Sequence, residues 1–566
     1  MALPAGTAMA QQIQPGTFKH IIIVVQENRT PDNLFGASSM VNSKCGQEQK
    51  PLIPGADIDN GGNGIPYGQT QPQPICNIPL SITGLYPCPS CHPVALADPD
   101  HSHGGWVTDY DLDSSGVSHM DGFCHEYDNS NWNGVCPSYS YVPQTEVQPY
   151  FDIASYYGFA NYMFQTNEGP SFPAHQFLFA GTSAPAQYTG PSSEGTWFDA
   201  DNVFHPTGED STCTAQGEIA PLIDSNGSEP NYIWCSTHHP QDPRCAAPCY
   251  ERAPSPYTWG SLADLLGAQS PPVNWKYYAP PVNPNGAING GLWVAPASIY
   301  HFCLPGWWYD KKNNKKYWEC LGLLNNGQYA SNMRWETTSN PVPIIDDITS
   351  CNLAQVSWVI PDGLWSDHAG ENNGSGPSYV ANIVNAIGES SQNSCGKDYW
   401  AGEPTAIFIT WDDWGGWFDH INPSLTGGPG VNQTQGTWGA YYTYGFRVPA
   451  LVVSAYTGTC TNPPTCTAWT GYVSGPCGLN TGYSCPNFGV SGNKQYVHDF
   501  GSILAFIEWN FLGLGGIGTI GQEGYPFADN YAPDWNPVTG QVPLLDFFTP
   551  SGPRPFQPIN IPRRTR

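Results

Sequence analysis

The sequence predicts an α/β fold in which a mostly parallel central sheet is flanked by helices and carries long, disulfide-rich loop insertions. Short apolar runs rich in β-branched residues are typical of strands buried on both faces, and four occur, at 20–25, 356–360, 406–410 and 450–454. Helical patterns lie at 173–180, 378–387 and 498–512. Strands that alternate with helices indicate an α/β layer architecture.

Each of the four runs reads as a strand for the same reasons. HIIIVV at 20–25 is short, continuous and almost entirely β-branched, and VSWVI, AIFIT and ALVVS follow it in chain order. Runs of this length are too short for typical helices. The helix predicted at 173–180 has Pro173 near its first turn, a position that suits proline.

The remaining segments differ in composition. Residues 37–150 and 185–345 are rich in Gly, Pro, Asn and Cys, with little periodicity, and residues 455–495 carry four Cys. We interpret all three as insertions into a single domain spanning 11–523, lying over the functional edge of the sheet. A Pro-rich extension, 524–566, is expected to lie extended on the surface.

The charge balance limits the possible partners. The chain of 566 residues has 47 acidic side chains against 19 Lys and Arg, a formal net charge of −28. A surface this negative repels nucleic acid and anionic membranes. Phosphate can still bind where a metal reverses the local sign. A small phosphate ester or phospholipid is therefore an acceptable substrate, and no protein partner is indicated.

Cysteine usage favours an oxidising compartment. There are 18 Cys, an even number, and many lie close in sequence. Zinc is the alternative for Cys88 and Cys91, which precede His92, but no second pair with zinc-ribbon spacing is present. Disulfides are the favoured interpretation.

Ala8-Met9-Ala10 resembles the end of a signal peptide, of which 1–10 would be a remnant. No apolar stretch is long enough to span a membrane, so we expect a secreted or periplasmic protein.

Two predicted strands end in acidic and amide side chains. Glu27 and Asn28 follow the first, and Asp412 and Asp413 follow the third. Ligands of open α/β sheets bind at the carboxyl ends of strands, although a solvated strand end is the plainer interpretation of either segment alone. Adjacent carboxylates suit a cation. Oxygen-rich ligands indicate one or more hard divalent ions, with Mg, Ca, Mn and Zn left open.

Ser171 and His368 are candidates for the chemistry. Ser171 lies at the start of a predicted helix, where serine usually caps the helix. As a nucleophile it would have the positive helix end beside it to attract a phosphoryl group. His368 follows the second strand and could be a metal ligand, a general acid, a phosphoryl stabiliser or an ordinary exposed histidine.

A third acidic segment, Asp109 to Asp113, resembles the start of a calcium loop. Ser114 stands where an EF-hand has its turn glycine, and Met120 stands where it has its closing glutamate. A specific calcium site there is therefore not predicted.

Segments spread over most of the chain, in order and with matching spacing, resemble motifs of the bacterial phosphoesterase family, which includes secreted phospholipases C and acid phosphatases. They are 20–29 (HIIIVVQENR) with Asp32 and 35–36, 169–175 (GPSFPAH), 356–361 (VSWVIP) with Asp367 and His368, 410–416 (TWDDWGG) with Asp419 and His420, 445–449 (GFRVP), and 498–499 with Ser502.

The resemblance implies an alkaline-phosphatase-like core and a metal held by acidic and Asn side chains. By position, the ligands would be Glu27, Asn28, Asp412 and Asp413. Ser171 would be the nucleophile that forms a phospho-enzyme intermediate.

The resemblance also implies histidines that act on the transferring group. His368 would stabilise or protonate it. His101 resembles a histidine ahead of the family's Met-Asp-Gly segment (here 120–122), with His103 as a second possible register. His301 is a further candidate.

The residue type at the position of the nucleophile indicates which class of phosphate ester the protein prefers. The family's phospholipases often carry Thr and its phosphatases carry Ser, so Ser171 favours an acid-phosphatase-like phosphomonoesterase. In the same segment the family often has Asn before the histidine, and here it is Ala174.

One alternative is a phospholipase C that cleaves phosphodiester headgroups, which aromatic loop residues such as Trp307 and Trp308 could bind by cation–π contacts. A second alternative is a non-catalytic binding protein on the same scaffold.

Overall fold

The structure is a computed structural model of the chain. Side chains are described for 13–36, 53, 55–59, 98–115, 117–123, 138–181, 183, 261–280, 293–296, 299, 302, 331–337, 339–423, 444–459, 470–474, 497–513 and 542–561. Short strands outside these ranges are described by their backbone alone: β2 (Leu85–Tyr86), β3 (Val94–Ala95), β6 (Phe198–Asp199), β7 (Ala220–Ile223), β8 (Cys245–Ala246), β10 (Pro305–Asp310) and β11 (Lys315–Cys320).

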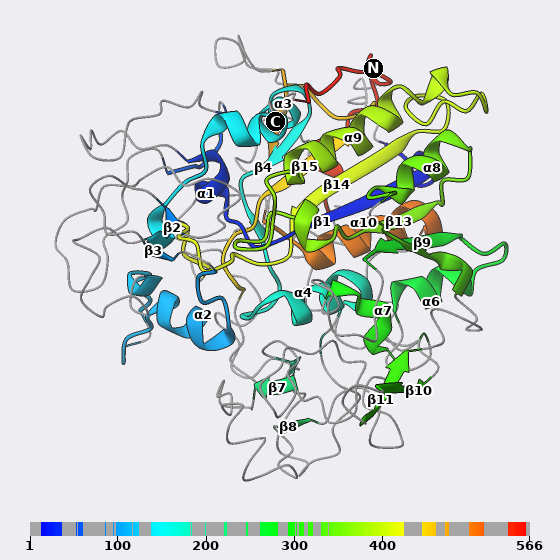
Figure 1. The fold of residues 1–566 in the computed structure, drawn as a ribbon. Helices are drawn as coiled ribbons and strands as arrows, with labels where there is room; N and C mark the ends of the chain where they lie inside the picture. Colours follow the sequence, from blue (N-terminus) through cyan, green and yellow to red (C-terminus); the bar gives the residue numbers. More distant parts are fainter. Residues whose placement is uncertain are drawn as a thin grey trace, which may run out of the picture.

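The core is an eight-stranded sheet with the order β12-β9-β13-β1-β14-β15-β4-β16 (Figure 1). The strands from β12 to β14 are all parallel, β15 is antiparallel to both its neighbours, and β16 is parallel to β4. The predicted α/β fold with a mostly parallel sheet is confirmed. The strands are β1 (His20–Gln26), β4 (Gly158–Ala160), β9 (Trp275–Ala279), β12 (Met333–Trp335), β13 (Val356–Val359), β14 (Thr405–Trp411), β15 (Ala450–Ser454) and β16 (Tyr472–Ser474).

The four predicted strands form the middle of this sheet. Every residue of β1, β13, β14 and β15 is buried, as expected for apolar runs covered on both faces. β1 and β14 each extend slightly beyond the predicted runs and end at Gln26 and Trp411, which lie opposite each other in the register. The two predicted acidic segments therefore leave the sheet side by side.

Helices cover both faces of the sheet (Figure 1). Helices α3, α8 and α9 lie on one face, and α4, α6, α7 and α10 lie on the other. The helices are α1 (Pro31–Phe35), α2 (His103–Tyr110), α3 (Gln144–Tyr156), α4 (Ser171–Ala180), α6 (Leu262–Gly267), α7 (Ala295–Ser298), α8 (Pro343–Thr349), α9 (Gly376–Gly388) and α10 (Phe500–Leu512). A separate two-stranded sheet pairs β5 (Met163–Phe164) with β17 (His498–Asp499).

Parts of the segments interpreted as insertions contribute to this core. β9 and β12, both within 185–345, are strands of the central sheet, and α3, within 37–150, packs against α9 and β15. The C-terminal extension also contributes, since Phe547 and Phe548 are buried and the ring of Phe548 packs on those of Phe18 and Phe506. Residues 552–561 contain no helix or strand.

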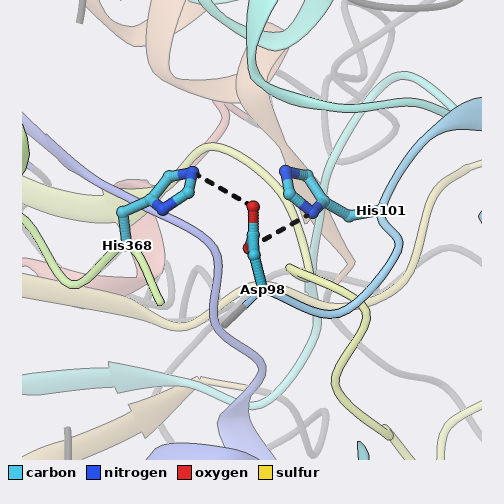
Figure 2. Close-up of side chains that lie close together, drawn as sticks. All are labelled: Asp98, His101 and His368. Carbon is cyan, nitrogen blue, oxygen red and sulfur yellow. Dashed lines mark ion pairs between the residues drawn. The ribbon is translucent and has the colours of Figure 1, made fainter. Parts of the chain in front are cut away.

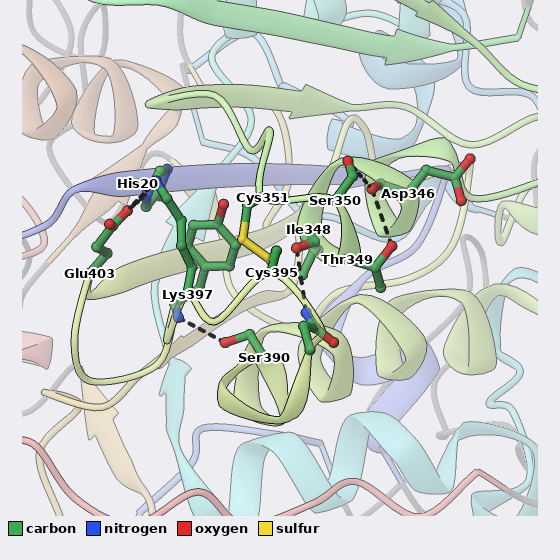
Figure 3. The surroundings of a disulfide bond; sticks show 12 residues. His20, Asp346, Ile348, Thr349, Ser350, Cys351, Ser390, Cys395, Lys397 and Glu403 are labelled. Carbon is green, nitrogen blue, oxygen red and sulfur yellow. Dashed lines mark hydrogen bonds and ion pairs between the residues drawn. A yellow bond between two sulfur atoms is a disulfide. The ribbon is translucent and has the colours of Figure 1, made fainter.

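One disulfide joins Cys351, just before β13, to Cys395, before β14 (Figure 3). It ties together two connections that enter the sheet on the same edge. The other cysteines, including Cys88 and Cys91, lie outside the residues whose side chains are described. Among the described helices, none combines the length and apolar character needed to cross a membrane.

Candidate active site

Backbone hydrogen bonds hold the ends of β1 and β14 in register beyond the sheet itself. Asp412 N donates to Gln26 O at 3.0 Å, and Arg29 N donates to Asp413 O at 3.0 Å. Asn28 N donates to Asp412 Oδ1 at 2.9 Å. Since parallel strands end at the same edge of a sheet, the predicted ligands from both strands meet there.

Unusual backbone conformations allow this close approach. Asn28 has a φ of +61°, in the left-handed region that Asn tolerates better than most residues. Gly415 has a φ of +64°, and a Cβ there would lie 2.4 Å from Asn28 O, so only glycine fits. At Gly416 a Cβ would lie 2.5 Å from Pro99 Cβ, close to the segment that carries His101. The glycines therefore bring segments of the site together.

Each carboxylate has one oxygen bound by an N–H group. Asp412 Oδ1 accepts from Asn28 N at 2.9 Å and Asp413 N at 2.8 Å. Asp413 Oδ1 accepts from Gly415 N at 2.7 Å. Glu27 Oε1 lies 2.9 Å from His175 Nε2. The second oxygens of Glu27 and Asp413 both contact Ser171 Oγ, and carboxylate oxygens of Glu27 and Asp412 lie within 4.8 Å of each other.

Ser171 Oγ lies among these oxygens. It is 3.1 Å from Asp413 Oδ2, 3.2 Å from Glu27 Oε2 and 3.4 Å from Asn28 Oδ1. A hydroxyl has a single proton and can satisfy only one such acceptor. The interpretation of Ser171 as a helix cap does not hold, because α4 begins at Ser171 itself, after Pro170, without a side-chain cap.

The electrostatics of this oxygen cluster call for a cation. Burial, followed by repulsion from Asp412, raises the pKa of Glu27 and of Asp413 well above their usual ranges. Asp412 Oδ2 is buried and has no hydrogen-bond partner among the described residues. Buried charges are expected to be paired or to bind metals, so these residues fit a divalent ion with oxygen ligands.

The side-chain amide of Asn28 lies between these carboxylates and two histidines. Its Oδ1 faces Asp412 Oδ1 and Asp413 Oδ2, each at 3.3 Å, and its Nδ2 faces His101 and His368. Turned over, the amide would donate to both carboxylates, which suits a site without metal. With its oxygen toward the carboxylates, the same amide could join them as a ligand of a hard ion.

The two histidines present matching faces to the site. His101 Nδ1 lies 2.8 Å from Pro99 O, and His368 Nδ1 lies 2.8 Å from Ala369 O. Each Nδ1 must carry a proton to bond a carbonyl, and each Nε2 faces the side-chain amide of Asn28, at 3.0 Å for His101 and 3.2 Å for His368. This geometry brings both predicted histidines to the predicted ligands.

Asp98 lies between these histidines (Figure 2). Its oxygens are 3.7 Å from His101 Nδ1 and 3.9 Å from His368 Nε2. Burial lowers the pKa of His101, but the carboxylates of Asp98 and Asp413 outweigh this effect and raise it to about 10. Nothing in the sequence alone pointed to Asp98, since it stands in an irregular segment with other acidic residues.

His175 is also part of the site and was not among the predicted site residues. Its Nε2 lies 2.9 Å from Glu27 Oε1 and 3.6 Å from Asp412 Oδ2, and the side chain is fully buried. Burial lowers the pKa of His175 to about 4, so the ring is neutral. The available signal was its spacing of four residues from Ser171, which places both side chains on one face of a helix.

The remaining candidates fall elsewhere. His103 Nδ1 lies 2.9 Å from Glu168 O and its ring stacks beside Trp106, so His101, not His103, faces the ligands. His301 lies outside the described residues. Asp113 binds the N–H groups of Ser115 and Val117 within its own loop, where no calcium site was predicted.

A second ionic cluster lies behind the site. Asp32 Oδ2 is 2.7 Å from His420 Nδ1, and Arg447 Nε is 2.9 Å from Asp419 Oδ1. Arg447 also donates to Asp57 O and Asn161 O, both at 2.8 Å. The cluster joins three of the motifs identified in the sequence, and its carboxylates already have cationic partners.

Comparisons with known proteins place the chain in a family. Phospholipase C B of Mycobacterium tuberculosis (strain ATCC 25618 / H37Rv) is 30% identical over 157 residues, which cover 24% of this chain and 28% of that protein. Non-hemolytic phospholipase C of Burkholderia pseudomallei (strain K96243) is 32% identical over 124 residues, covering 20% of this chain and 17% of that protein. The matches thus span less than a third of each relative. The sequence model of the Phosphoesterase family matches residues 18–512, which is most of the chain, and the protein therefore belongs to the Phosphoesterase family.

Proposed function

We propose that this protein is a metal-dependent phosphoric ester hydrolase that acts mainly on phosphate monoesters through a phosphoserine formed on Ser171. The observation that carries the proposal is the position of Ser171 Oγ, within 3.1–3.4 Å of oxygens of Glu27, Asn28 and Asp413. Membership of the Phosphoesterase family supports the class of reaction. The choice of monoesters rests on serine as the nucleophile.

In the first step Ser171 Oγ attacks the phosphorus atom, an O–P bond forms to serine, and the bond from phosphorus to the ester oxygen breaks. The nearest acceptor for the hydroxyl proton is Asp413 Oδ2, at 3.1 Å. A bound divalent ion, held by Glu27, Asn28, Asp412 and Asp413, would supply positive charge that favours the alkoxide and the transferring phosphoryl group.

Other groups of the chain position the phosphoryl group and the departing alcohol. The Nδ1–H groups of His101 and His368 bind backbone carbonyls, which turns both Nε2 atoms toward the site. When the ring is protonated, its Nε2–H can donate to a phosphoryl oxygen or protonate the leaving oxygen. Helix α4 begins at Ser171, so the positive end of its dipole lies at the attacking atom. In the second step a water molecule attacks phosphorus, inorganic phosphate leaves and Ser171 regains its proton.

Replacing the nucleophile tests this assignment. Ser171→Ala should abolish hydrolysis of a chromogenic phosphate monoester while the circular dichroism spectrum and the unfolding midpoint stay close to wild type. Acid quenching of the wild-type reaction should yield a phosphorylated peptide that contains Ser171, detected by mass spectrometry. Activity of Ser171→Ala near the wild-type rate would refute the proposal.

A phospholipase C is the second candidate, favoured by what the relatives from Mycobacterium tuberculosis and Burkholderia pseudomallei are called. The two candidates differ in substrate, so the rates on a choline phosphodiester chromogen and on a monoester should be compared at equal concentrations. A higher kcat/KM for the diester would favour the phospholipase. A protein that hydrolyses neither, with or without added metal, would favour the non-catalytic binding protein.

We also propose that the protein works outside the cytoplasm, in the periplasm or after secretion. The disulfide between Cys351 and Cys395 supports this, because such bonds persist in oxidising compartments. Cell fractionation of a bacterium expressing the full-length gene tests it.

A further inference from the structure

The directions of the carboxylate oxygens restrict the kind of ion that the site can hold. We propose that the site selects a small divalent ion, Mg²⁺ or Mn²⁺, over Ca²⁺, and that His175 is a positioning residue that enforces this choice by holding one oxygen of Glu27. This inference rests on the proposed function, because it takes the same oxygen cluster as the metal centre.

The first step concerns how many oxygens each carboxylate can offer. Asp412 Oδ1 is held by two backbone N–H groups, at 2.8 and 2.9 Å, and Asp413 Oδ1 by one, at 2.7 Å. Glu27 Oε1 is held by His175 at 2.9 Å. These contacts favour an ion that binds each carboxylate through its other oxygen. Ca²⁺ takes six to eight ligands and commonly uses carboxylates bidentately, which these N–H contacts oppose.

The second step counts the oxygens left for an ion. They are Glu27 Oε2, Asn28 Oδ1, Ser171 Oγ, Asp412 Oδ2 and Asp413 Oδ2. Five single oxygens leave one position of an octahedron for a phosphoryl oxygen of the substrate. Octahedral oxygen coordination is typical of Mg²⁺ and Mn²⁺, whereas Zn²⁺ prefers fewer ligands that include nitrogen or sulfur.

The third step concerns the role of His175, which could itself be taken for a ligand. A histidine that binds a metal through Nε2 donates its Nδ1–H to an acceptor. His175 Nδ1 is buried and has no hydrogen-bond partner within the described part of the chain. The tautomer with the proton on Nε2 avoids burying an unpaired Nδ1–H. His175 is therefore a donor to Glu27 Oε1, with Asp412 Oδ2 3.6 Å away, and not a ligand.

Metal binding to the metal-free protein tests the inference without reference to activity. The protein is stripped with a chelator, dialysed, and titrated with MgCl₂, MnCl₂ or CaCl₂ in a calorimeter. We expect Mg²⁺ and Mn²⁺ to bind at least about tenfold more tightly than Ca²⁺. His175→Ala should weaken Mg²⁺ binding by roughly 10–100-fold, the usual effect of losing a group that orients a ligand.

The same variant should also change the selectivity. Without His175, Glu27 Oε1 is free to join Oε2 on the ion, so the ratio of Mg²⁺ to Ca²⁺ affinity should fall. His175→Gln, which keeps an N–H donor, is the matched control and should lie nearer to wild type. Asp113→Asn removes the carboxylate from the other acidic loop, and Ca²⁺ affinities are compared in that background so that binding there is not counted.

Three results would overturn the inference. Ca²⁺ binding as tightly as Mg²⁺ in the Asp113→Asn protein would contradict the selectivity, even if His175→Ala failed to fold. Equal Mg²⁺/Ca²⁺ affinity ratios in wild type and a folded His175→Ala would contradict the role of His175. Undiminished hydrolysis by the chelator-stripped protein without any added metal would refute the metal dependence in the proposed function, and the inference with it.

Discussion

Replacing Arg447 tests how the second ionic cluster, formed by Asp32, Asp419, His420 and Arg447, stabilises the protein. Its guanidinium is fully buried and contacts both oxygens of Asp419, at 2.9 and 3.2 Å, and two backbone carbonyls at 2.8 Å each. Arg447→Met keeps much of the volume and removes the charge and the donors. We expect the free energy of unfolding to fall by about 3–5 kcal/mol, the usual cost of breaking a buried ion pair.

The loss should depend on pH in a defined direction. Burial raises the pKa of Asp419 to about 6, and Arg447 is the main group that opposes this rise. In the wild type, the stabilising contribution of protonated Asp419 is present below its ordinary pKa of 3.8 and is lost as the pH rises through 6. Without Arg447 the folded-state pKa rises further, so above pH 6 the variant should lose a further ~1.4 kcal/mol per pH unit relative to wild type.

Urea unfolding at pH 5, 6, 7 and 8 measures this difference. The control is Arg447→Met combined with Asp419→Asn, which removes the titrating group and should abolish the extra slope above pH 6. None of these substitutions removes the contact of His420 Nδ1 with Asp32 Oδ2, at 2.7 Å. Two results would show that Asp419 is not the group that Arg447 neutralises. One is a difference in unfolding free energy between Arg447→Met and wild type that stays constant from pH 5 to 8. The other is a dependence of that difference on pH above 6 that persists in the double variant.

Two further predictions concern stability away from this cluster. Burial raises the pKa of Glu336 to about 8 from its usual 4.5, so its stabilising contribution is present below 4.5 and lost as the pH rises through 8. Glu336→Gln removes this titrating group, so between pH 4.5 and 8 the variant should lose up to about 5 kcal/mol less unfolding free energy than the wild type. An unfolding free energy that depends on pH as in the wild type would contradict this. The bond from Cys351 to Cys395 closes a loop with a sequence separation of 44, so Cys351→Ser with Cys395→Ser should lower the unfolding free energy by about 4 kcal/mol. Urea midpoints equal to those of the oxidised wild type would refute the second prediction.

The sequence predicted the centre of the fold because strong patterns lie there. β1, β13, β14 and β15 are continuous apolar runs, and such runs are recognisable when both faces of a sheet are covered. β9 (WKYYA) and β12 (MRW) were missed because they are short, aromatic and interrupted by Lys276 and Arg334. Lys276 is accommodated because its Nζ reaches Asp347 at 2.8 Å, a contact that no local pattern reveals.

The candidate site was predictable as far as strand ends and motif order allowed. Glu27, Asn28, Asp412 and Asp413 follow buried strands, and their meeting follows from parallel pairing alone. Asp98 could not be predicted, because its position depends on tertiary packing against His101 and His368. The surroundings of Ser171 required the fold as well, since only the tertiary structure shows its hydroxyl among carboxylates instead of at a helix cap.

The charge of the site implies an order of binding. Glu27, Asp412 and Asp413 are buried together beside Ser171, and any of these carboxylates that ionises without a cation would repel the phosphoryl group in the proposed reaction. At a separation of about 4 Å, repulsion between unit charges costs about 4 kcal/mol at an effective dielectric constant of 20. A divalent ion reverses this repulsion locally, although the whole chain has a net charge of −28. We therefore expect the proposed metal to bind before the substrate, and the affinity for phosphate to fall with the affinity for metal in variants such as His175→Ala.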